Sequence, residues 1–373
     1  PELQPRAIAW AETMAGHPGA GMVRAHREPG GRLELGVPVL REQREAWEAD
    51  HLRPGAALAR GGGERALPEE PDPERTCFER DRDRIVHSTA FRRLAGKTQV
   101  VVFPTDHQRT RLTHALEVAQ VATSIARGVG ANVTLAEAIA LGHDCGHGPG
   151  GHASEDAFDA FLPNGYNHGP WGADVVLTGL NLCSQTLDGI RNHSWSRPVP
   201  ATVEGEIVSW ADRIAYCAHD LEDAASAGIL SLDDLPEAVV AVAGSTRREQ
   251  LGAFVRAVVG TVATTGQVGM GPDQAAALAA LRAFNYERIY TRPDSLAQAG
   301  AVIEVLRALV QYYSEHPGSM PSDFALPALD GADGVHAAVT YVAGMTDRFA
   351  FETAGELLSW DPDRLPRGIG RGA

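Results

Sequence analysis

Apolar residues recur every three or four positions along most of the chain, which is the spacing of one face of an α-helix. One such stripe runs from Leu112 to Ala126, and Gly128 and Gly130 follow it as a helix stop. Runs that alternate between apolar and polar residues, as half-buried strands do, are few. The pattern therefore predicts an all-α protein without an internal repeat.

Two more helices are predicted around the middle of the chain. One begins at Thr134, which forms a capping box with Glu137, and ends near Asp144, where glycines interrupt the period. The other runs from about Glu204 to Ala227, with its apolar residues on one face. Further helices are predicted at residues 39–49, 235–260, 273–290, 296–315 and 334–358.

The helical pattern divides the chain into three parts. Residues 1–75 are rich in Gly and Pro and are expected to be a partly irregular N-terminal extension. Residues 76–230 hold the candidate chemistry and are expected to form the catalytic core. Residues 231–373 are expected to be a C-terminal helical region that completes the same domain.

Composition adds limits on location and chemistry. The chain has 373 residues, of which 44% are hydrophobic and 22% charged, as is usual for globular proteins. It contains no run of roughly 18 apolar residues, so no membrane span is expected and a cytoplasmic location is the default expectation. The four cysteines form no CxxC pair and are expected to be buried free thiols: Cys77, Cys145, Cys183 and Cys217.

Charge is distributed unevenly. The net charge of -15 disfavours indiscriminate binding to nucleic acid. Between Glu74 and Arg111, however, nine Lys or Arg stand against five Asp or Glu, a local net charge of +4. This excess indicates that a small polyanion is handled there. The alternative is a solvated surface with alternating charges, which Arg80–Arg84 also fits.

Histidine precedes aspartate at two places, residues 143–144 and 219–220. The first pair ends one predicted helix, while His114 lies in the preceding helix and Asp212 in a later one. Three helices of a bundle can direct His114, His143, Asp144 and Asp212 into one core site. Such a mixed nitrogen and oxygen set suits Mn²⁺, Mg²⁺, Fe²⁺, Ni²⁺ or Zn²⁺. From spacing alone, four unrelated polar residues remain the alternative.

The glycine-rich segment Gly146–His152 follows the metal candidates and carries two more histidines, His147 and His152. Glu155 comes three residues after His152, so the two share a helix face. A histidine and a carboxylate beside a metal suit proton transfer. The alternative is a glycine loop with surface histidines.

The helix that carries Asp212 has a second polar face. Tyr216 and Asp220 follow Asp212 at intervals of four residues, so they are expected on the same wall. Arg213, next to Asp212, can reach a phosphate. Ordinary core packing is the alternative for Tyr216.

Four ordered segments carry a family resemblance: RDRDRIVHSTAFRRLAGKTQV (80–100), RTRLTHALEVAQ (109–120), AIALGHDCGHGPGGHASE (138–155) and WADRIAYCAHDLED (210–223). Together they resemble the dGTPase-like deoxynucleoside triphosphate triphosphohydrolases of the HD-domain superfamily. A later segment, YVAGMTDRFA (341–350), is similar to the bacterial members. The resemblance covers residues 50–355 and implies an HD-domain helical bundle with additional C-terminal helices.

The resemblance also implies an activity and a set of roles. It implies one divalent metal, held by His114, His143, Asp144 and Asp212, and water attack on the α-phosphorus of a dNTP, which releases deoxynucleoside and tripolyphosphate. It further implies a homo-oligomer and, for some members, nucleotide or single-stranded DNA effectors. The remaining roles that it implies are proton transfer for His152 and Glu155, contact with the phosphates for Arg111, His147, His168 and Arg213, and contact with the sugar for Gln99, Tyr216 and Asp220.

Three positions depart from the family pattern. Cys145 stands where Leu is usual, Gly96 is smaller than the usual residue, and Gly151 falls in a segment that commonly reads Pro-Phe-Gly-His, so an aromatic residue is missing. These changes are expected to reshape the pocket. They motivate the alternative of an HD-type nucleotidase or phosphodiesterase acting on another nucleotide. A third interpretation is a non-catalytic nucleotide sensor, against which the His152 and Glu155 pair argues.

Overall fold

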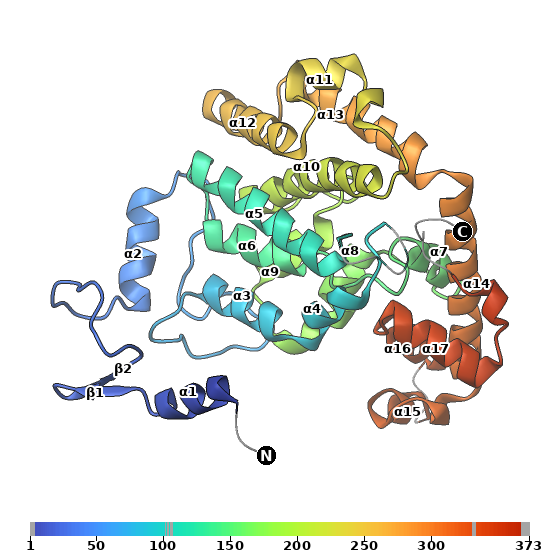
Figure 1. The fold of residues 1–373 in the computed structure, drawn as a ribbon, viewed down its shortest axis with the longest axis horizontal. Helices are drawn as coiled ribbons and strands as arrows, with labels where there is room; N and C mark the ends of the chain where they lie inside the picture. The colour runs from blue at the N-terminus through green and yellow to red at the C-terminus, as the bar shows by residue number, and fades with distance from the viewer. Residues whose placement is uncertain (1–3, 101, 103, 105–106, 330–332, 367–373) are drawn as a thin grey trace. The chain divides into compact units, whose positions relative to one another are not determined.

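The computed structural model describes residues 4–100, 102, 104, 107–329 and 333–366 (Figure 1). Backbone packing divides the chain into two compact units, Pro1–Val39 and Leu40–Ala373. The first contains helix α1 (Pro5–Thr13) and an antiparallel hairpin of β1 (His17–Gly19) and β2 (Met22–Arg24). The three-part division at residues 75 and 230 stays a prediction.

Three helices form the centre of the second unit: α5 (Arg111–Val129), α6 (Val133–Gly142) and α10 (Val203–Ser226) pack against one another (Figure 1). The predicted stripe of α5 is completely buried at Ala122 and Ala126. The same core is covered by α3 (Cys77–His87), α4 (Thr89–Arg93), α9 (Ser184–Asn192), α11 (Glu237–Ala243), α12 (Arg247–Thr265) and α13 (Pro272–Asn285). Helix α2 (Arg41–His51) contacts α3 through an ion pair between Arg44 and Glu79 at 2.6 Å.

A second apolar cluster lies around α14 (Pro293–Glu315), whose residues Val302, Leu306 and Leu309 are fully buried. The helices that surround it are α7 (Ala153–Asp159), α8 (His168–Trp171), α15 (Ser322–Leu329), α16 (Gly334–Ala343) and α17 (Asp347–Leu358). Short 3-10 or π-helical segments complete the fold: η1 (Leu94–Gly96), η2 (Gly172–Val176), η3 (Thr178–Leu180), η4 (Leu232–Asp234), η5 (Tyr286–Tyr290), η6 (Pro317–Ser319) and η7 (Pro362–Arg364). The all-α prediction is confirmed, and none of the described helices combines the length and the apolarity needed to cross a membrane.

Helix ends differ from the prediction in three places. Asn132, not Thr134, caps α6, because its side chain accepts from the backbone N–H groups of residues 134 and 135. The helix predicted at 235–260 is two helices, separated at Gly244, whose φ of 81° a helix cannot continue. The helix predicted at 334–358 is likewise divided, and Thr346 caps its second part, α17.

A buried carboxylate ties the C-terminal helices to the centre of the unit. Asp347, at the start of α17, is 3% exposed and accepts hydrogen bonds from the backbone N–H of Thr98 at 2.9 Å and of Gly150 at 2.8 Å. The hydroxyl of Thr98 donates to the same side chain. Nearby, Nζ of Lys97 donates to the carbonyl groups of Ala343 and His147. Two segments that flank the candidate site thus depend on α16 and α17.

We expect Asp347→Ala to lower the free energy of unfolding by roughly 1–3 kcal/mol, because it leaves buried N–H donors without acceptors. Urea denaturation measures the change. Glu352→Ala, on the exposed face of the same helix, is the control and should stay within about 0.5 kcal/mol of the wild type. Equal stability of the two variants would contradict the role of Asp347.

Candidate metal centre and active site

Four polar side chains converge where α5, α6 and α10 meet. His114 comes from α5, His143 and Asp144 follow the last turn of α6, and Asp212 comes from α10. Nε2 of His114 lies 3.2 Å from Nε2 of His143 and 3.2 Å from Oδ1 of Asp212. Oδ1 of Asp144 lies 3.4 Å from Nε2 of His143. The fold therefore brings together the four residues that the sequence predicts as metal ligands.

The spacing of these atoms fits a single metal ion. Ligand atoms bound at about 2.1 Å to one ion lie about 3.0 Å apart in an octahedral arrangement and about 3.4 Å apart in a tetrahedral one. The N···N and N···O separations in the cluster, 3.2 to 3.7 Å, are close to these values. Two imidazoles and two carboxylates also balance the charge of a divalent cation.

Hydrogen bonds direct the lone pairs of the cluster inwards. Nδ1 of His143 donates to the carbonyl of Ala140 at 2.6 Å, so Nε2 of the neutral ring has no proton and faces the other three residues. Burial lowers the pKa of His143, which keeps the ring neutral. Burial alone would raise the pKa of Asp212, but the hydrogen bond with His114 lowers it, so the carboxylate is ionised.

Arg111 lies directly behind the cluster. It is 1% exposed, and its Nη1 donates to Oδ2 of Asp144 at 2.8 Å. Burial opposes ionisation of Asp144, yet Arg111 holds the pKa of that carboxyl well below its usual range. Nη2 of Arg111 lies 3.4 Å from Nδ1 of His152. The guanidinium that is expected to contact a triphosphate therefore also holds Asp144, one of the proposed metal ligands.

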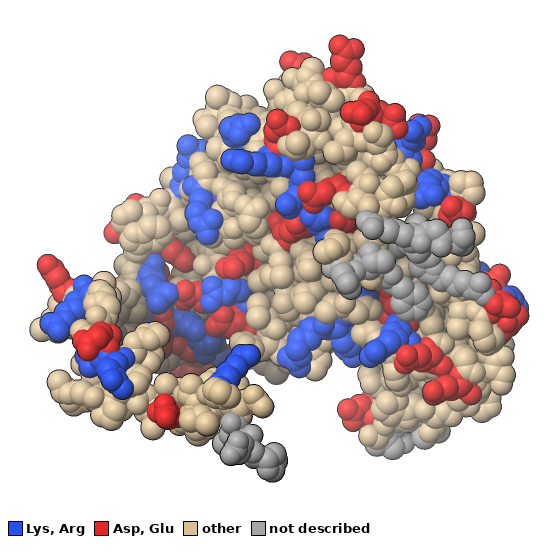
Figure 2. Space-filling model, in the orientation of Figure 1, with Lys and Arg blue, Asp and Glu red and all other residues tan. Residues whose placement is uncertain are grey.

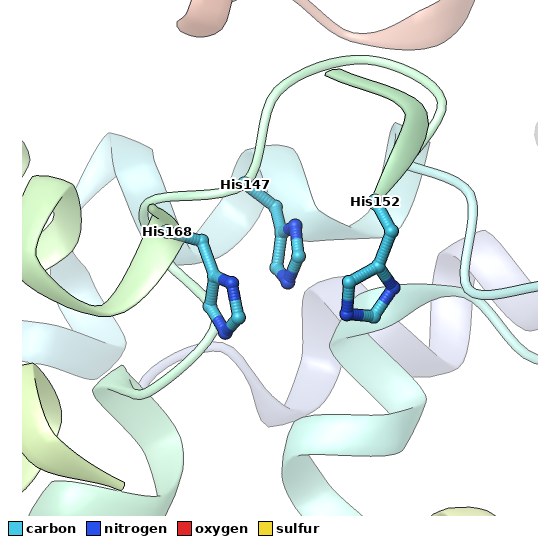
Figure 3. A group of neighbouring side chains, drawn as sticks. All are labelled: His147, His152 and His168. Carbon is cyan, nitrogen blue, oxygen red and sulfur yellow. The ribbon is translucent and has the colours of Figure 1, made fainter. Parts of the chain in front are cut away.

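Three histidines line the space beside the cluster: His147, His152 and His168 (Figure 3). The rings of His147 and His168 are stacked with centroids 3.7 Å apart. Glu155 was expected to pair with His152. In the structure its carboxylate instead hydrogen-bonds with Nδ1 of His168 and accepts from the backbone N–H of His168 at 3.2 Å. The cause is the position of the N-terminus of α8, which offers Glu155 two donors at once.

The two residues proposed for proton transfer differ in electrostatic environment. The ring of His152 faces the cavity. Desolvation by the surrounding protein atoms, and next the positive charge of Arg111, lower its pKa to about 4. Burial would raise the pKa of Glu155, but the hydrogen bond from His168 lowers it to about 2. At neutral pH the pair is therefore a neutral imidazole and a carboxylate.

A cavity of about 470 Å³ opens beside the four clustered residues. It lies within the usual range for small-molecule sites. Oε1 of Gln99 is buried in its wall without a partner among the described residues. His143 and Glu155 are not among its lining residues. The predicted residues that line it are Gln99, Arg111, His114, Asp144, His147, His152, His168, Asp212, Arg213, Tyr216 and Asp220.

Several lining residues were missed in the sequence. Trp195 lies under the guanidinium of Arg213, with Cζ 3.3 Å from the ring centroid, and Arg282 donates to the hydroxyl of Tyr216 at 2.9 Å. His193 contacts His168, Nε2 to Nε2, at 3.0 Å. These residues stand at no regular interval from the recognised motifs, so the sequence offers no signal for them.

The three departures from the family pattern lie outside the cavity lining. A Cβ on Gly96 would lie 2.9 Å from Thr346 Cγ2, so the absence of a side chain here lets the N-terminus of α17 pack closely. A Cβ on Gly151 would lie 2.8 Å from Nη2 of Arg111, and on the adjacent Gly150 2.4 Å from Val302. Cys145 is buried. The glycines thus accommodate close packing by Arg111, α14 and α17.

Most of the basic residues between Glu74 and Arg111 are paired with acidic ones. Arg80 and Arg84 both contact Glu69, and Arg75 contacts Asp72. Figure 2 shows Lys and Arg interspersed with Asp and Glu on one face of the molecule. For these arginines the structure favours the alternative of a charged surface. Arg111 is the basic residue of this segment that lines the cavity.

Comparison with known families agrees with the fold and the site. The HD domain matches residues 111–217, which include the four clustered residues. The phosphohydrolase-associated domain matches residues 268–356, which include α16 and most of α17. An all-α fold with a His/Asp cluster able to hold a metal, inside a matched HD domain, defines an HD-domain phosphohydrolase.

Curated relatives define the family more closely. Deoxyguanosinetriphosphate triphosphohydrolase-like proteins are 40% identical in Caldanaerobacter subterraneus over 319 residues, 39% in Clostridium perfringens over 326 and 38% in Desulfatibacillum aliphaticivorans over 340. The alignments cover 83%, 83% and 84% of this chain and 93%, 95% and 96% of the relatives. The chain belongs to this deoxyguanosinetriphosphate triphosphohydrolase-like family.

Asp220 generates a prediction about pH. It is 3% exposed, and burial raises the pKa of its carboxyl to about 7, although the Tyr290 hydroxyl donates to Oδ2 at 2.6 Å. The Asp220 carboxyl keeps its proton to a higher pH in the folded state than in the unfolded chain. The stability that this protonated carboxyl contributes is therefore lost as pH rises from about 4 to about 7.

Asp220→Asn removes this loss. The free energy of unfolding of the variant, relative to that of the wild type, should therefore rise between pH 5 and pH 8 in urea titrations. Asp294→Asn, which replaces an exposed aspartate, controls for loss of a charge. A difference for Asp220→Asn that does not change with pH would exclude the buried carboxyl as a titrating group.

Proposed function

We propose that the protein hydrolyses deoxynucleoside triphosphates to deoxynucleoside and tripolyphosphate. The observation that carries this proposal is the convergence of His114, His143, Asp144 and Asp212 beside a cavity that is also lined by histidines and arginines. A triphosphate carries several negative charges, and cationic groups beside a metal are what its transition state requires.

The four clustered residues would hold one divalent ion, for which we propose Mn²⁺ or Mg²⁺. When bound, such an ion polarises a phosphoryl oxygen and lowers the pKa of water. Arg111 keeps Asp144 ionised and directs Nη2 towards His152. Arg213, whose Cζ lies over the Trp195 ring, supplies a second guanidinium at the cavity wall.

His152 is the proposed proton-transfer residue. Its ring is neutral in the free protein because its pKa is about 4. A triphosphate bound opposite would raise this pKa, so the ring can exchange a proton with the attacking water or the leaving 5′ oxygen. Glu155 holds His168 in place and adds negative charge near His152.

The wall formed by α10 fits the nucleoside part. Asp220 lies eight residues after Asp212, a rise of about 12 Å along the helix. Tyr216 lies between them, with its hydroxyl fixed by Arg282. We propose that Gln99, Tyr216 and Asp220 surround the sugar, where an additional 2′-hydroxyl without a partner would cost about 1–3 kcal/mol.

Purified protein with Mn²⁺ and each dNTP is expected to yield deoxynucleoside and tripolyphosphate, because attack at the α-phosphorus breaks the bond to the sugar oxygen. Product-resolved chromatography against the matching NTPs tests the reaction and the sugar preference together. Release of monophosphate or diphosphate would instead support the alternative of an HD-type nucleotidase or phosphodiesterase. Binding without any turnover would support the nucleotide sensor.

His152→Ala is expected to retain bound metal while turnover falls by roughly 10²–10⁴-fold, the usual effect of losing a general acid or base. Elemental analysis and single-turnover kinetics measure the two quantities. His87→Ala, at the end of α3 and outside the cavity lining, is the matched control. Turnover of the His152 variant equal to that of the control would remove His152 from the mechanism.

A further inference from the structure

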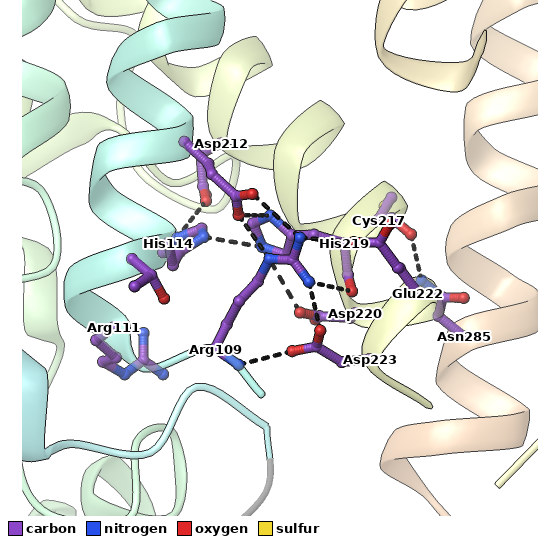
Figure 4. A network of polar contacts seen from close by, with 12 residues as sticks. Arg109, Arg111, His114, Asp212, Cys217, His219, Asp220, Glu222, Asp223 and Asn285 are labelled. Carbon is purple, nitrogen blue, oxygen red and sulfur yellow. Dashed lines mark hydrogen bonds and ion pairs between the residues drawn. The ribbon is translucent and has the colours of Figure 1, made fainter. Parts of the chain in front are cut away.

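A second histidine stands directly behind His114. His219 is 2% exposed and comes from α10, seven residues after Asp212. Its Nε2 lies 3.2 Å from Nδ1 of His114, and its Nδ1 lies 2.8 Å from Oε2 of Glu117. Figure 4 shows His219 between His114 and Arg109. The metal ligands predicted from the sequence include the 143–144 dipeptide and not His219, and no role is predicted for Glu117.

These contacts place a proton on Nδ1 of His219 and a proton on Nδ1 of His114. An ionised carboxylate can only accept, so Nδ1 of His219 carries the proton that Glu117 accepts. Nε2 of the neutral ring is then an acceptor, and Nδ1 of His114 donates to it. Nε2 of His114 faces the cluster, 3.2 Å from Oδ1 of Asp212, and is the atom whose lone pair would bind a metal ion. Each of these hydrogen bonds favours the His114 tautomer with its proton on Nδ1, which a metal ligand bound through Nε2 needs.

The carboxylate at the far end is fixed by two arginines. Nε of Arg109 donates to Oε2 of Glu117 at 2.7 Å, and Nη1 of Arg247 donates to Oε1 at 2.9 Å. Glu222 binds the same two arginines, at 2.7 Å from Nη2 of Arg109 and 3.0 Å from Nε of Arg247. No contact between Glu222 and His219 is present among the described residues. The chain thus provides its own matched control for Glu117.

His143 is oriented differently, by the backbone carbonyl of Ala140. A carbonyl has only a partial negative charge, whereas Glu117 contributes a full one through His219. The hydrogen bonds from His114 through His219 to Glu117 therefore make Nε2 of His114 more basic than Nε2 of His143. Glu117, a partly buried carboxylate three residues after His114, supplies this charge.

We propose that Glu117 and His219 are positioning residues of the metal centre, which fix the tautomer and orientation of His114. The inference rests on the proposed metal site and adds two residues that stand behind it. Partners of this kind typically change metal affinity by about 10–100-fold.

The test compares Glu117→Gln with Glu222→Gln. Each loses one charge from the same pair of arginines, and urea denaturation of both variants measures any loss of stability separately from metal binding. The dissociation constant for Mn²⁺, measured by competition with a chromophoric chelator, should rise about 10–100-fold for Glu117→Gln and less than about 2-fold for Glu222→Gln. Turnover of Glu117→Gln should largely recover at saturating Mn²⁺.

A second pair of variants separates positioning from folding. Glutamine at 219 keeps one acceptor and one donor, so His219→Gln should bind Mn²⁺ more tightly than His219→Leu, which keeps neither. Equal Mn²⁺ affinity of Glu117→Gln and Glu222→Gln, or of the two His219 variants, would overturn the inference. Wild-type affinity in Asp144→Ala would instead overturn the metal site itself.

Discussion

The structure depends on the burial of negative charge at the junction of α5, α6 and α10. Asp144 is 3% exposed on its side chain and remains ionised, which a bundle core tolerates only with compensating charge. Arg111 supplies part of that charge, and a divalent ion held by the four clustered residues would supply more. With positive charge carried by the arginine and by a bound ion, the neighbouring imidazoles would be neutral and would present lone pairs.

The C-terminal helices contribute to the site by anchoring the backbone beside it. The glycine segment that carries His147 and His152 has few side chains of its own to anchor it. Its backbone is held instead by Asp347, through the N–H of Gly150, and by Lys97, which bonds the carbonyl groups of His147 and Ala343. The motif that includes Asp347 therefore serves the site without touching the cavity, which is why its sequence alone suggested no role.

The sequence predicts most of the helices because helical periodicity is a property of short intervals. It predicts the four clustered residues because each falls in a short motif that resembles a known family. Helical period, a glycine stop at Gly130 and the spacing of motifs are all local. Contacts between distant segments are not. Glu155 pairs with His168 rather than His152 because α8 presents two donors, and His193 enters the cavity through the packing of α9. Neither outcome follows from spacing along the chain, because each depends on where another helix ends.

The two His-Asp dipeptides show how position within a helix decides chemistry. Residues 143 and 144 lie just beyond the end of α6, where the backbone leaves the helix and both side chains reach the same cluster. Residues 219 and 220 lie inside α10, where neighbouring side chains diverge by about 100°. His219 therefore meets His114, while Asp220 meets Tyr290 on another wall. One dipeptide supplies two proposed ligands to a single ion, and the other divides its residues between support of that ion and the proposed sugar pocket.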